Sequence, residues 1–334
     1  MAEQPHQLRR AGDEAPDQVS AISGSAVRPG DRIFRGLSVG ASASVLGIMA
    51  AIAAFLIYQA IPALAKNDAN FFTETKWFPD ADPGQPVVFG IAAMVAGTLA
   101  SSIIAMIVAV PVAIGIALFI TYYAPRKLAK PLAYIVDLLA AVPSIVFGLW
   151  GFFFFRNQLD GLVFWLDRWL GWTGVFAFRP DANPANQSLF TAGLVLAIMI
   201  LPIVSAISRE VFTQVPTANI EAALALGATR WEMIRISVLP FGRAGVTSAS
   251  ILGLGRALGE TLAVTLILTA AYDVNLHLTE NGGITFASNI ALKNGEAGTI
   301  GTGALIASGL ILFLITLGVN SLSQLIVRRG NQEA

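Results

Sequence analysis

Two side chains of opposite charge, Arg256 and Glu260, lie inside a long apolar stretch of the 334-residue chain. Their four-residue spacing predicts one helical face, with the two residues about 6 Å apart along the axis. A charge at the centre of a bilayer costs at least about 2.5 kcal/mol, so such residues are usually paired, inward-facing and functional. The guanidinium fork matches the oxygens of an oxyanion, and the carboxylate can offset its burial. Two interpretations stay open: an oxyanion pathway, or an ion pair that only neutralises itself during assembly.

Small and hydroxyl-bearing residues surround this pair. Gly255 and Gly259 form a Gly-x-x-x-Gly pattern, which we expect to let a second helix backbone approach closely. Thr261, Thr265 and Thr269 follow at four-residue steps and predict a polar stripe beside the pair. Hydroxyls in a helix can equally bond the backbone carbonyl four residues earlier, so the stripe alone does not establish a pathway.

Composition excludes several other kinds of chemistry. The chain has no Cys and only 2 His, which removes disulfides, thiolate chemistry and most zinc sites. Its net charge of +0 gives no electrostatic basis for binding nucleic acid. No Gly-x4-Gly-Lys-Ser/Thr phosphate-binding loop occurs, so the chain is not expected to hydrolyse ATP by that route. We therefore predict no catalytic residue, no metal site and no cofactor.

Long apolar stretches must position the charged pair. The chain is 55% hydrophobic, and the stretches that are long enough to cross a bilayer, at about 20 residues each, predict an all-α, multi-span membrane protein. Prolines at positions 111, 143 and 202 predict bends in the second, third and fourth spans. The six predicted spans are 37–64, 87–123, 132–155, 189–208, 244–272 and 297–327.

The distribution of positive charge predicts the orientation. Of the 21 Lys and Arg residues, 14 lie in the tail, the alternate loops and the C-terminal end, against 6 in the other loops. The positive-inside rule then places both termini and the loop between spans four and five in the cytoplasm. Residues 1–31 are polar and lack a signal-peptide pattern, so we interpret them as a disordered cytoplasmic tail. Residues 32–330 form the predicted six-span domain.

The loop between spans four and five, residues 216–240, has the pattern of two short helices. Its first half is rich in Ala, Leu and Glu, which are good helix formers, and Gly227 is the residue type on which a helix most readily ends. Thr229 and Glu232 predict a capping box that starts a second helix, and Pro240 is expected to end it. Such a loop suits docking of a soluble partner, whereas a plain hairpin between spans is the alternative.

Glu221, Ala222 and Ala223, followed by Gly227, resemble the EAA loop of ABC-importer permeases. That loop is the cytoplasmic element that engages the ATPase subunit of such importers. The resemblance implies that these four residues couple the chain to an ATPase.

A second resemblance covers the chain from about Asp31 to its C-terminus. The sequence GRALGETLAVT at 255–265 resembles the signature of the PstC-type permeases of phosphate-specific ABC importers, and LAAVPSIVFGLWG at 139–151 is similar to their third-span motif. The family commonly has Tyr where Phe147 stands and Glu where Asp137 stands. We therefore assign Phe147 no polar role, and we favour an interfacial position for Asp137 over a second pathway charge.

The resemblance implies a type I ABC-importer bundle of six helices in the inner membrane of a prokaryote. Arg256, Glu260, Thr261 and Thr265 would then line the pathway of inorganic phosphate. In the mechanism that we expect, Glu260 neutralises Arg256 at rest and the guanidinium exchanges its partner when phosphate arrives.

Three kinds of protein partner are implied by the same resemblance. They are a second permease subunit of PstA type, a cytoplasmic ATPase dimer of PstB type and an external phosphate-binding protein of PstS type. Two alternatives remain: a permease for another oxyanion such as molybdate or sulfate, and an ion-coupled secondary carrier. A carrier would favour internal repeats, which the sequence does not show, and would have no use for a docking loop.

Overall fold

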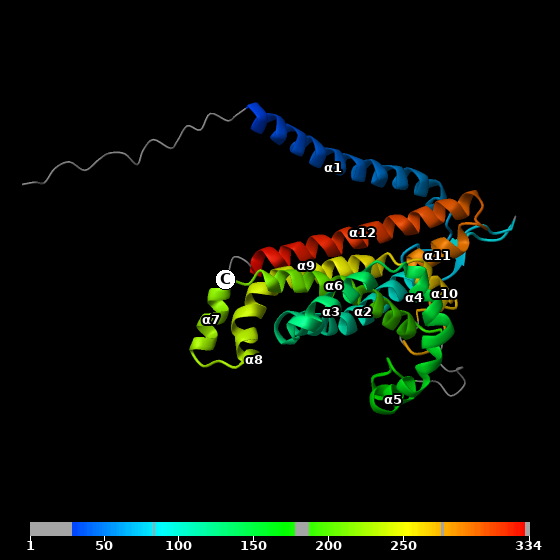
Figure 1. The fold of residues 1–334 in the computed structure, drawn as a ribbon. Helices are drawn as coiled ribbons and strands as arrows, with labels where there is room; N and C mark the ends of the chain where they lie inside the picture. Colours follow the sequence, from blue (N-terminus) through cyan, green and yellow to red (C-terminus); the bar gives the residue numbers. More distant parts are fainter. Residues whose placement is uncertain (1–28, 83, 178–186, 275–276, 331–334) are drawn as a thin grey trace, which may run out of the picture. The chain divides into compact units, whose positions relative to one another are not determined.

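The structure is a computed structural model that describes residues 29–82, 84–177, 187–274 and 277–330 (Figure 1). The predicted tail, residues 1–31, lies almost wholly outside the described part. Helices dominate the chain, and the strands consist of one short antiparallel pair, β1 (Trp77–Phe78) and β2 (Val88–Phe89), in the part that is described. By composition and length, four described helices can cross a membrane, or five if one bent pair counts as a single span. The all-α prediction is confirmed.

Four of the six predicted spans are single helices. They are α1 (Pro29–Leu64), α2 (Ala92–Leu118), α6 (Leu189–Thr213) and α12 (Thr299–Gly330). Both α2 and α6 continue through their internal prolines, Pro111 and Pro202. A π-helical turn, Phe119–Tyr123, extends α2 to the end of the predicted second span.

The predicted third span is divided at Pro143. One part is α3 (Arg126–Ala140), and the other is α4 (Ser144–Trp150), which continues as a π-helical turn, Gly151–Phe155. The two parts meet at an angle of 91°. Proline disfavours helical backbone in the residue before it and cannot donate to the preceding turn, which explains the break at this position.

The predicted fifth span is also divided, into α9 (Leu239–Leu258) and α10 (Leu262–Ile267). This pair is not among the helices apolar enough to be recognised as spans by composition. Its sequence explains why, because α9 carries Arg243, Arg256 and several Ser and Thr residues. The six-span arrangement is compatible with the structure, but only four spans are continuous helices.

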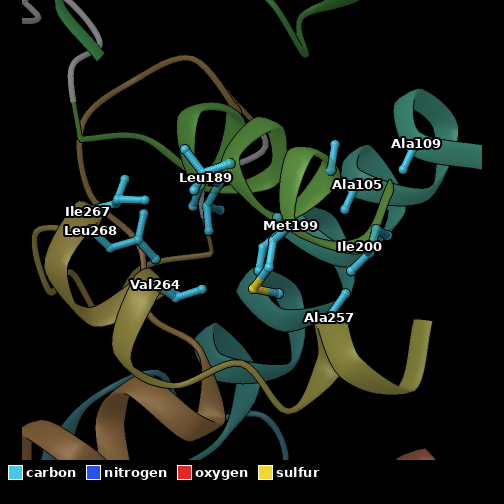
Figure 2. Close-up of a cluster of buried hydrophobic side chains, with 13 residues drawn as sticks. Ala105, Ala109, Leu189, Met199, Ile200, Ala257, Val264, Ile267 and Leu268 are labelled. Carbon is cyan, nitrogen blue, oxygen red and sulfur yellow. The ribbon is translucent and has the colours of Figure 1, made fainter. Parts of the chain in front are cut away.

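The core forms where α2 packs along α6. Gly193 makes this close approach possible, because a Cβ there would lie 2.7 Å from Ile104 on α2. Figure 2 shows side chains of α2 and α6 meeting those of the α9–α10 segment in one apolar cluster. Met199 and Ile200 of α6 and Val264 of α10 are almost wholly buried in it. The packing holds the α9–α10 break against the centre of the bundle.

Short elements connect the long helices. α5 (Asp160–Leu170) follows a 3-10 turn, Arg156–Gln158, and is followed by another, Gly171–Thr173. α11 (Phe286–Lys293) precedes α12, and α7 (Thr217–Ala225) with α8 (Arg230–Met233) forms the hairpin between α6 and α9. Asp80 accepts hydrogen bonds from the backbone N–H groups of Gly298 and Gly301, at 2.8 and 2.9 Å, and so caps the start of α12.

Candidate functional site

Arg256 and Glu260 lie on opposite sides of a helix break. Arg256 is in the last turn of α9, which ends at Leu258, while Glu260 lies just before α10. Gly259 caps the end of α9. The prediction of one continuous helical face was therefore wrong, because α9 closes at Gly259 before Glu260 is reached.

Glu260 has a local structural role. It is 8% exposed, and its Oε1 accepts a hydrogen bond from the backbone N–H of Ala263 at 3.2 Å. The carboxylate thus satisfies one of the backbone N–H groups that are left without partners at the start of α10, where a negative charge is also favoured. In the described part of the chain no ion pair joins Glu260 to Arg256, so the expected resting pair is not present in this structure.

Arg256 instead faces a pocket of about 630 Å³ between α6, α9 and α12. Its side chain makes no hydrogen bond or ion pair with any residue that the structure describes. Ser248, Leu252 and Arg256 follow one another at four-residue steps along the α9 side of this pocket, as expected for one helical stripe. The complete lining is Ile203, Ser248, Ile251, Leu252, Gly255, Arg256, Asn320 and Gln324.

The glycine pattern beside Arg256 does not bring two helices together within the described chain. A Cβ at Gly255 would meet no atom within 4 Å, and one at Gly259 would meet only the carbonyl of Gly255, at 3.6 Å. The close contacts lie elsewhere on α9, since a Cβ at Gly253 would lie 2.8 Å from Val204 of α6. Gly255 therefore leaves space in the Arg256 pocket.

The two threonines after Glu260 bond to their own backbone. Thr261 donates its hydroxyl hydrogen to the carbonyl of Gly259 at 3.3 Å, and Thr265 donates to the carbonyl of Thr261 at 2.7 Å. The bond of Thr265, to the carbonyl four residues earlier, is the local alternative that the sequence left open, and Thr261 bonds two residues back. Each hydroxyl oxygen still has acceptor capacity, but its hydrogen is not directed toward an anion in this structure.

The hairpin of α7 and α8 confirms the local predictions for Gly227, Thr229 and Glu232. Gly227 has a φ of +84°, the left-handed backbone that glycine adopts at low cost. Thr229 and Glu232 form the predicted capping box, with the Thr229 N–H donating to Glu232 at 2.8 Å and the Glu232 N–H donating to Thr229 at 3.3 Å. Hydrogen bonds from the Thr229 backbone and hydroxyl lower the pKa of Glu232 below its ordinary value.

The expectation for Pro240 was wrong. The chain continues without interruption from α8 through a π-helical turn, Ile234–Val238, into α9. Pro240 lies in the first turn of α9, directly after the π-helical turn, and does not end the helix. The second hairpin helix is therefore directly joined to the helix that carries Arg256.

The hairpin buries one side and exposes the other. Ala223 packs in a core cluster with Phe212 of α6 and Met233 of α8, whereas Glu221 and Ala222 are exposed. At the turn, Leu226 is 89% exposed and Trp231 is 57% exposed. A large exposed apolar pair beside a rigid turn is typical of a protein-binding surface.

The sequence did not reveal the partner of Asp137. Nη2 of Arg209 on α6 lies 3.1 Å from both carboxylate oxygens of Asp137 on α3. The two residues are separated by 72 positions, so no local spacing could have indicated the pair. It ties α3 to the part of α6 that leads into the hairpin.

The fold and these two sites define a class of protein. The chain combines apolar helices, a charged pocket among these helices and a capped helical hairpin. This combination is typical of a multi-span membrane transport protein. Residues 109–331 match the family described as binding-protein-dependent transport system inner membrane component. The chain belongs to this family.

Individual relatives match over nearly the whole chain. It is 47% identical to phosphate transport system permease protein PstC 2 of Mycobacterium tuberculosis, over 92% of this chain and 94% of the relative. It is 46% identical to phosphate transport system permease protein PstC of Mycobacterium leprae, over 92% and 96%. The fold is similar to a solved structure of the MetNI methionine ABC transporter in an inward facing conformation, with a TM-score of 0.52, 14% identity and coverage of 71% and 96%.

Proposed function

We propose that this chain is the membrane-spanning permease subunit of an ATP-driven importer of inorganic phosphate. Relatives named as phosphate transport permeases are 46–47% identical to it over 92% of its length, which supports phosphate over other oxyanions. Arg256 is the observation within the molecule that carries the proposal. An arginine without a counter-ion in the described chain, in a pocket among apolar helices, suits an anion that arrives and leaves.

Each of the four pathway residues has a distinct proposed role. Arg256 binds the phosphate oxygens through its guanidinium. Glu260 caps α10 and so holds open the break beside Arg256. Thr261 and Thr265 follow the break, and their hydroxyls can turn from the backbone carbonyls toward a passing anion. The earlier idea of partner exchange is replaced by an arginine that is free before the anion arrives.

The α7–α8 hairpin is the proposed coupling element. Exposed Leu226 and Trp231 would enter a groove of a cytoplasmic ATPase, and Glu221 and Ala222 lie on the exposed side of α7. Ala223 fixes α7 to the bundle and Gly227 fixes the turn. Because α8 runs on into α9, movement of the docked hairpin would reach Arg256 along one continuous stretch of helix.

The proposed complex contains three further components. They are a second permease subunit of PstA type, a PstB-type ATPase dimer and an external PstS-type phosphate-binding protein. The hairpin and both termini would lie in the cytoplasm, as the charge distribution indicates. Because the chain has no native Cys, Arg126→Cys should resist an impermeant thiol reagent added to intact cells, and Asp82→Cys in the β1–β2 loop should react. Reversed labelling would contradict this orientation.

Filling the pocket tests the proposed site. Gly255→Leu would project a large side chain beside Arg256, whereas Gly255→Ala meets no atom within 4 Å. In cells that depend on this chain, we expect Gly255→Leu to abolish uptake of radiolabelled phosphate and Gly255→Ala to preserve it. Both variants should accumulate in the membrane to the wild-type level. Normal uptake by Gly255→Leu would show that phosphate does not pass this pocket.

A further inference from the structure

Two amide side chains of α12, Asn320 and Gln324, line the same pocket as Arg256. They are four residues apart and therefore lie on one face of the helix. α12 packs beside α9 in the bundle (Figure 1). Neither amide makes a hydrogen bond with any residue in the described part of the chain.

These amides differ from the hydroxyls that precede them on α12. Thr302, Ser308 and Thr316 each donate to a carbonyl three or four residues earlier, at 2.7 or 2.8 Å. Asn320 and Gln324 have larger polar groups that are not satisfied in this way. Asn320 is partly buried and Gln324 is exposed, so both amides are free to bind a ligand in the pocket. They line the same pocket as an arginine that has no partner in the described chain, which indicates a shared ligand.

The chemistry of the three side chains is complementary. A guanidinium only donates hydrogen bonds, whereas an amide offers both an N–H2 donor and a carbonyl acceptor. The hydrogen phosphate ion carries one O–H, which needs an acceptor, and fully ionised sulfate carries none. Glu260 does not line the pocket, and its carboxylate caps α10, so the side-chain acceptors that line the pocket with Arg256 are the two amide oxygens of α12 and the hydroxyl oxygen of Ser248.

We propose that Asn320 and Gln324 position a protonated tetrahedral oxyanion against Arg256, donating to its bare oxygens and accepting from its O–H. This inference rests on the proposed function and specifies the site in which the anion pauses. It adds a preference for hydrogen phosphate over sulfate within the membrane, where a neutral acceptor avoids the repulsion that a carboxylate would exert. Binding must remain weak, because a transit site has to release its ion.

Weak binding of inorganic phosphate to the purified full-length chain in maltoside detergent can be measured from ³¹P line broadening near pH 8. The variants are Asn320→Leu and Gln324→Met, which keep side-chain size and remove the amide. Loss of a hydrogen bond to the anion should weaken the phosphate Kd at least about threefold in each. Ser321→Ala, on α12 but outside the pocket lining, is the matched control and should bind as the wild type does. Asn320→Asp, nearly isosteric, provides a second test, since its charge should also weaken binding.

Sulfate competition tests the selectivity. Sulfate should displace phosphate poorly from the wild type, and the difference between the two ions should shrink in the Asn320→Leu/Gln324→Met double variant. Wild-type phosphate affinity in that double variant, with loss only in Arg256→Gln, would overturn the role of the amides and leave the proposed function intact. This competition measures the selectivity of the purified chain itself, because no binding protein is present.

Two other outcomes would also overturn the inference. If phosphatidic acid in mixed micelles binds through the amides and inorganic phosphate does not, the pocket holds a lipid headgroup. If the double variant loses a co-purifying permease subunit but keeps its phosphate affinity, the amides belong to a subunit interface. Failure of the proposed function would give a different result from failure of this inference. In that case Arg256→Gln would still support phosphate uptake in cells.

Discussion

The backbone N–H of Ala263 donates to Oε1 of Glu260 at 3.2 Å, so this buried carboxylate belongs to the start of α10. Gln at this position keeps an oxygen acceptor and removes the charge, whereas Leu keeps neither. We expect Glu260→Gln to change the free energy of unfolding little and Glu260→Leu to lower it by about 1–3 kcal/mol, because the Ala263 N–H is then buried without a partner. Thermal unfolding of the purified chain measures both, and equal losses would contradict the capping role.

The left-handed turn of the hairpin gives a prediction for coupling. A Cβ at Gly227 would meet no atom within 4 Å, so only its φ of +84° restricts substitution. Asn tolerates this backbone, whereas a β-branched Val should cost about 1–2 kcal/mol and rearrange the turn. We expect Gly227→Asn to retain phosphate uptake and ATPase co-purification, and Gly227→Val to lose both while still inserting. If Val is as active as Asn, the turn is not needed for coupling.

The capping box predicts a pH dependence at the same hairpin. Because hydrogen bonds from Thr229 lower the folded-state pKa of Glu232, the capping box is fully stabilised above the unfolded pKa of about 4.5. That stabilisation should be lost as the pH falls through the lowered folded pKa. Hydrogen exchange of the Glu232 amide, corrected for the intrinsic rate, should show falling protection in that range. Glu232→Gln keeps a capping residue without a titrating group and should remove this pH dependence.

The pair of Asp137 and Arg209 predicts coupling between α3 and α6. The side chains are 49% and 21% exposed, so the pair should contribute only about 0.2–1 kcal/mol, as partly exposed ion pairs do. We expect Asp137→Asn and Arg209→Gln each to lower the thermal stability of the purified chain. The double variant should recover most of the loss, because neither charge is then left alone. Additive losses would show that the two residues act independently.

Local patterns in the sequence predicted those parts that depend on neighbouring residues. The capping box of Thr229 and Glu232, the turn at Gly227 and the bend at Pro143 follow from backbone preferences, and all are present, whereas α2 and α6 continue as single helices through Pro111 and Pro202. The break after Arg256 was missed, because residues 244–272 were interpreted as one apolar stretch that continues across Gly259 and Glu260. A buried carboxylate can form an ion pair with a cation or cap the start of a helix. The neighbouring sequence does not distinguish these two roles.

Contacts between distant elements were beyond the sequence. Asp137 and Arg209 are brought together only by the packing of α3 on α6, and Asn320 meets the Arg256 pocket only because α12 packs on α9. One sequence contains no signal for such pairs. The family resemblance identified Arg256, but the pocket that surrounds it required the arrangement of three helices.

Uptake of radiolabelled phosphate by Arg256→Gln, Glu260→Gln and their double variant tests directly whether Arg256 binds phosphate during transport. The two side chains form no ion pair in the described chain, so removing the carboxylate should not rescue loss of the guanidinium. We predict measurable uptake in Glu260→Gln, and a loss of at least about tenfold in both Arg256→Gln and the double variant, each with normal membrane levels and ATPase co-purification. Recovery of uptake in the double variant would contradict the account, because Arg256 would then serve only to balance a buried charge.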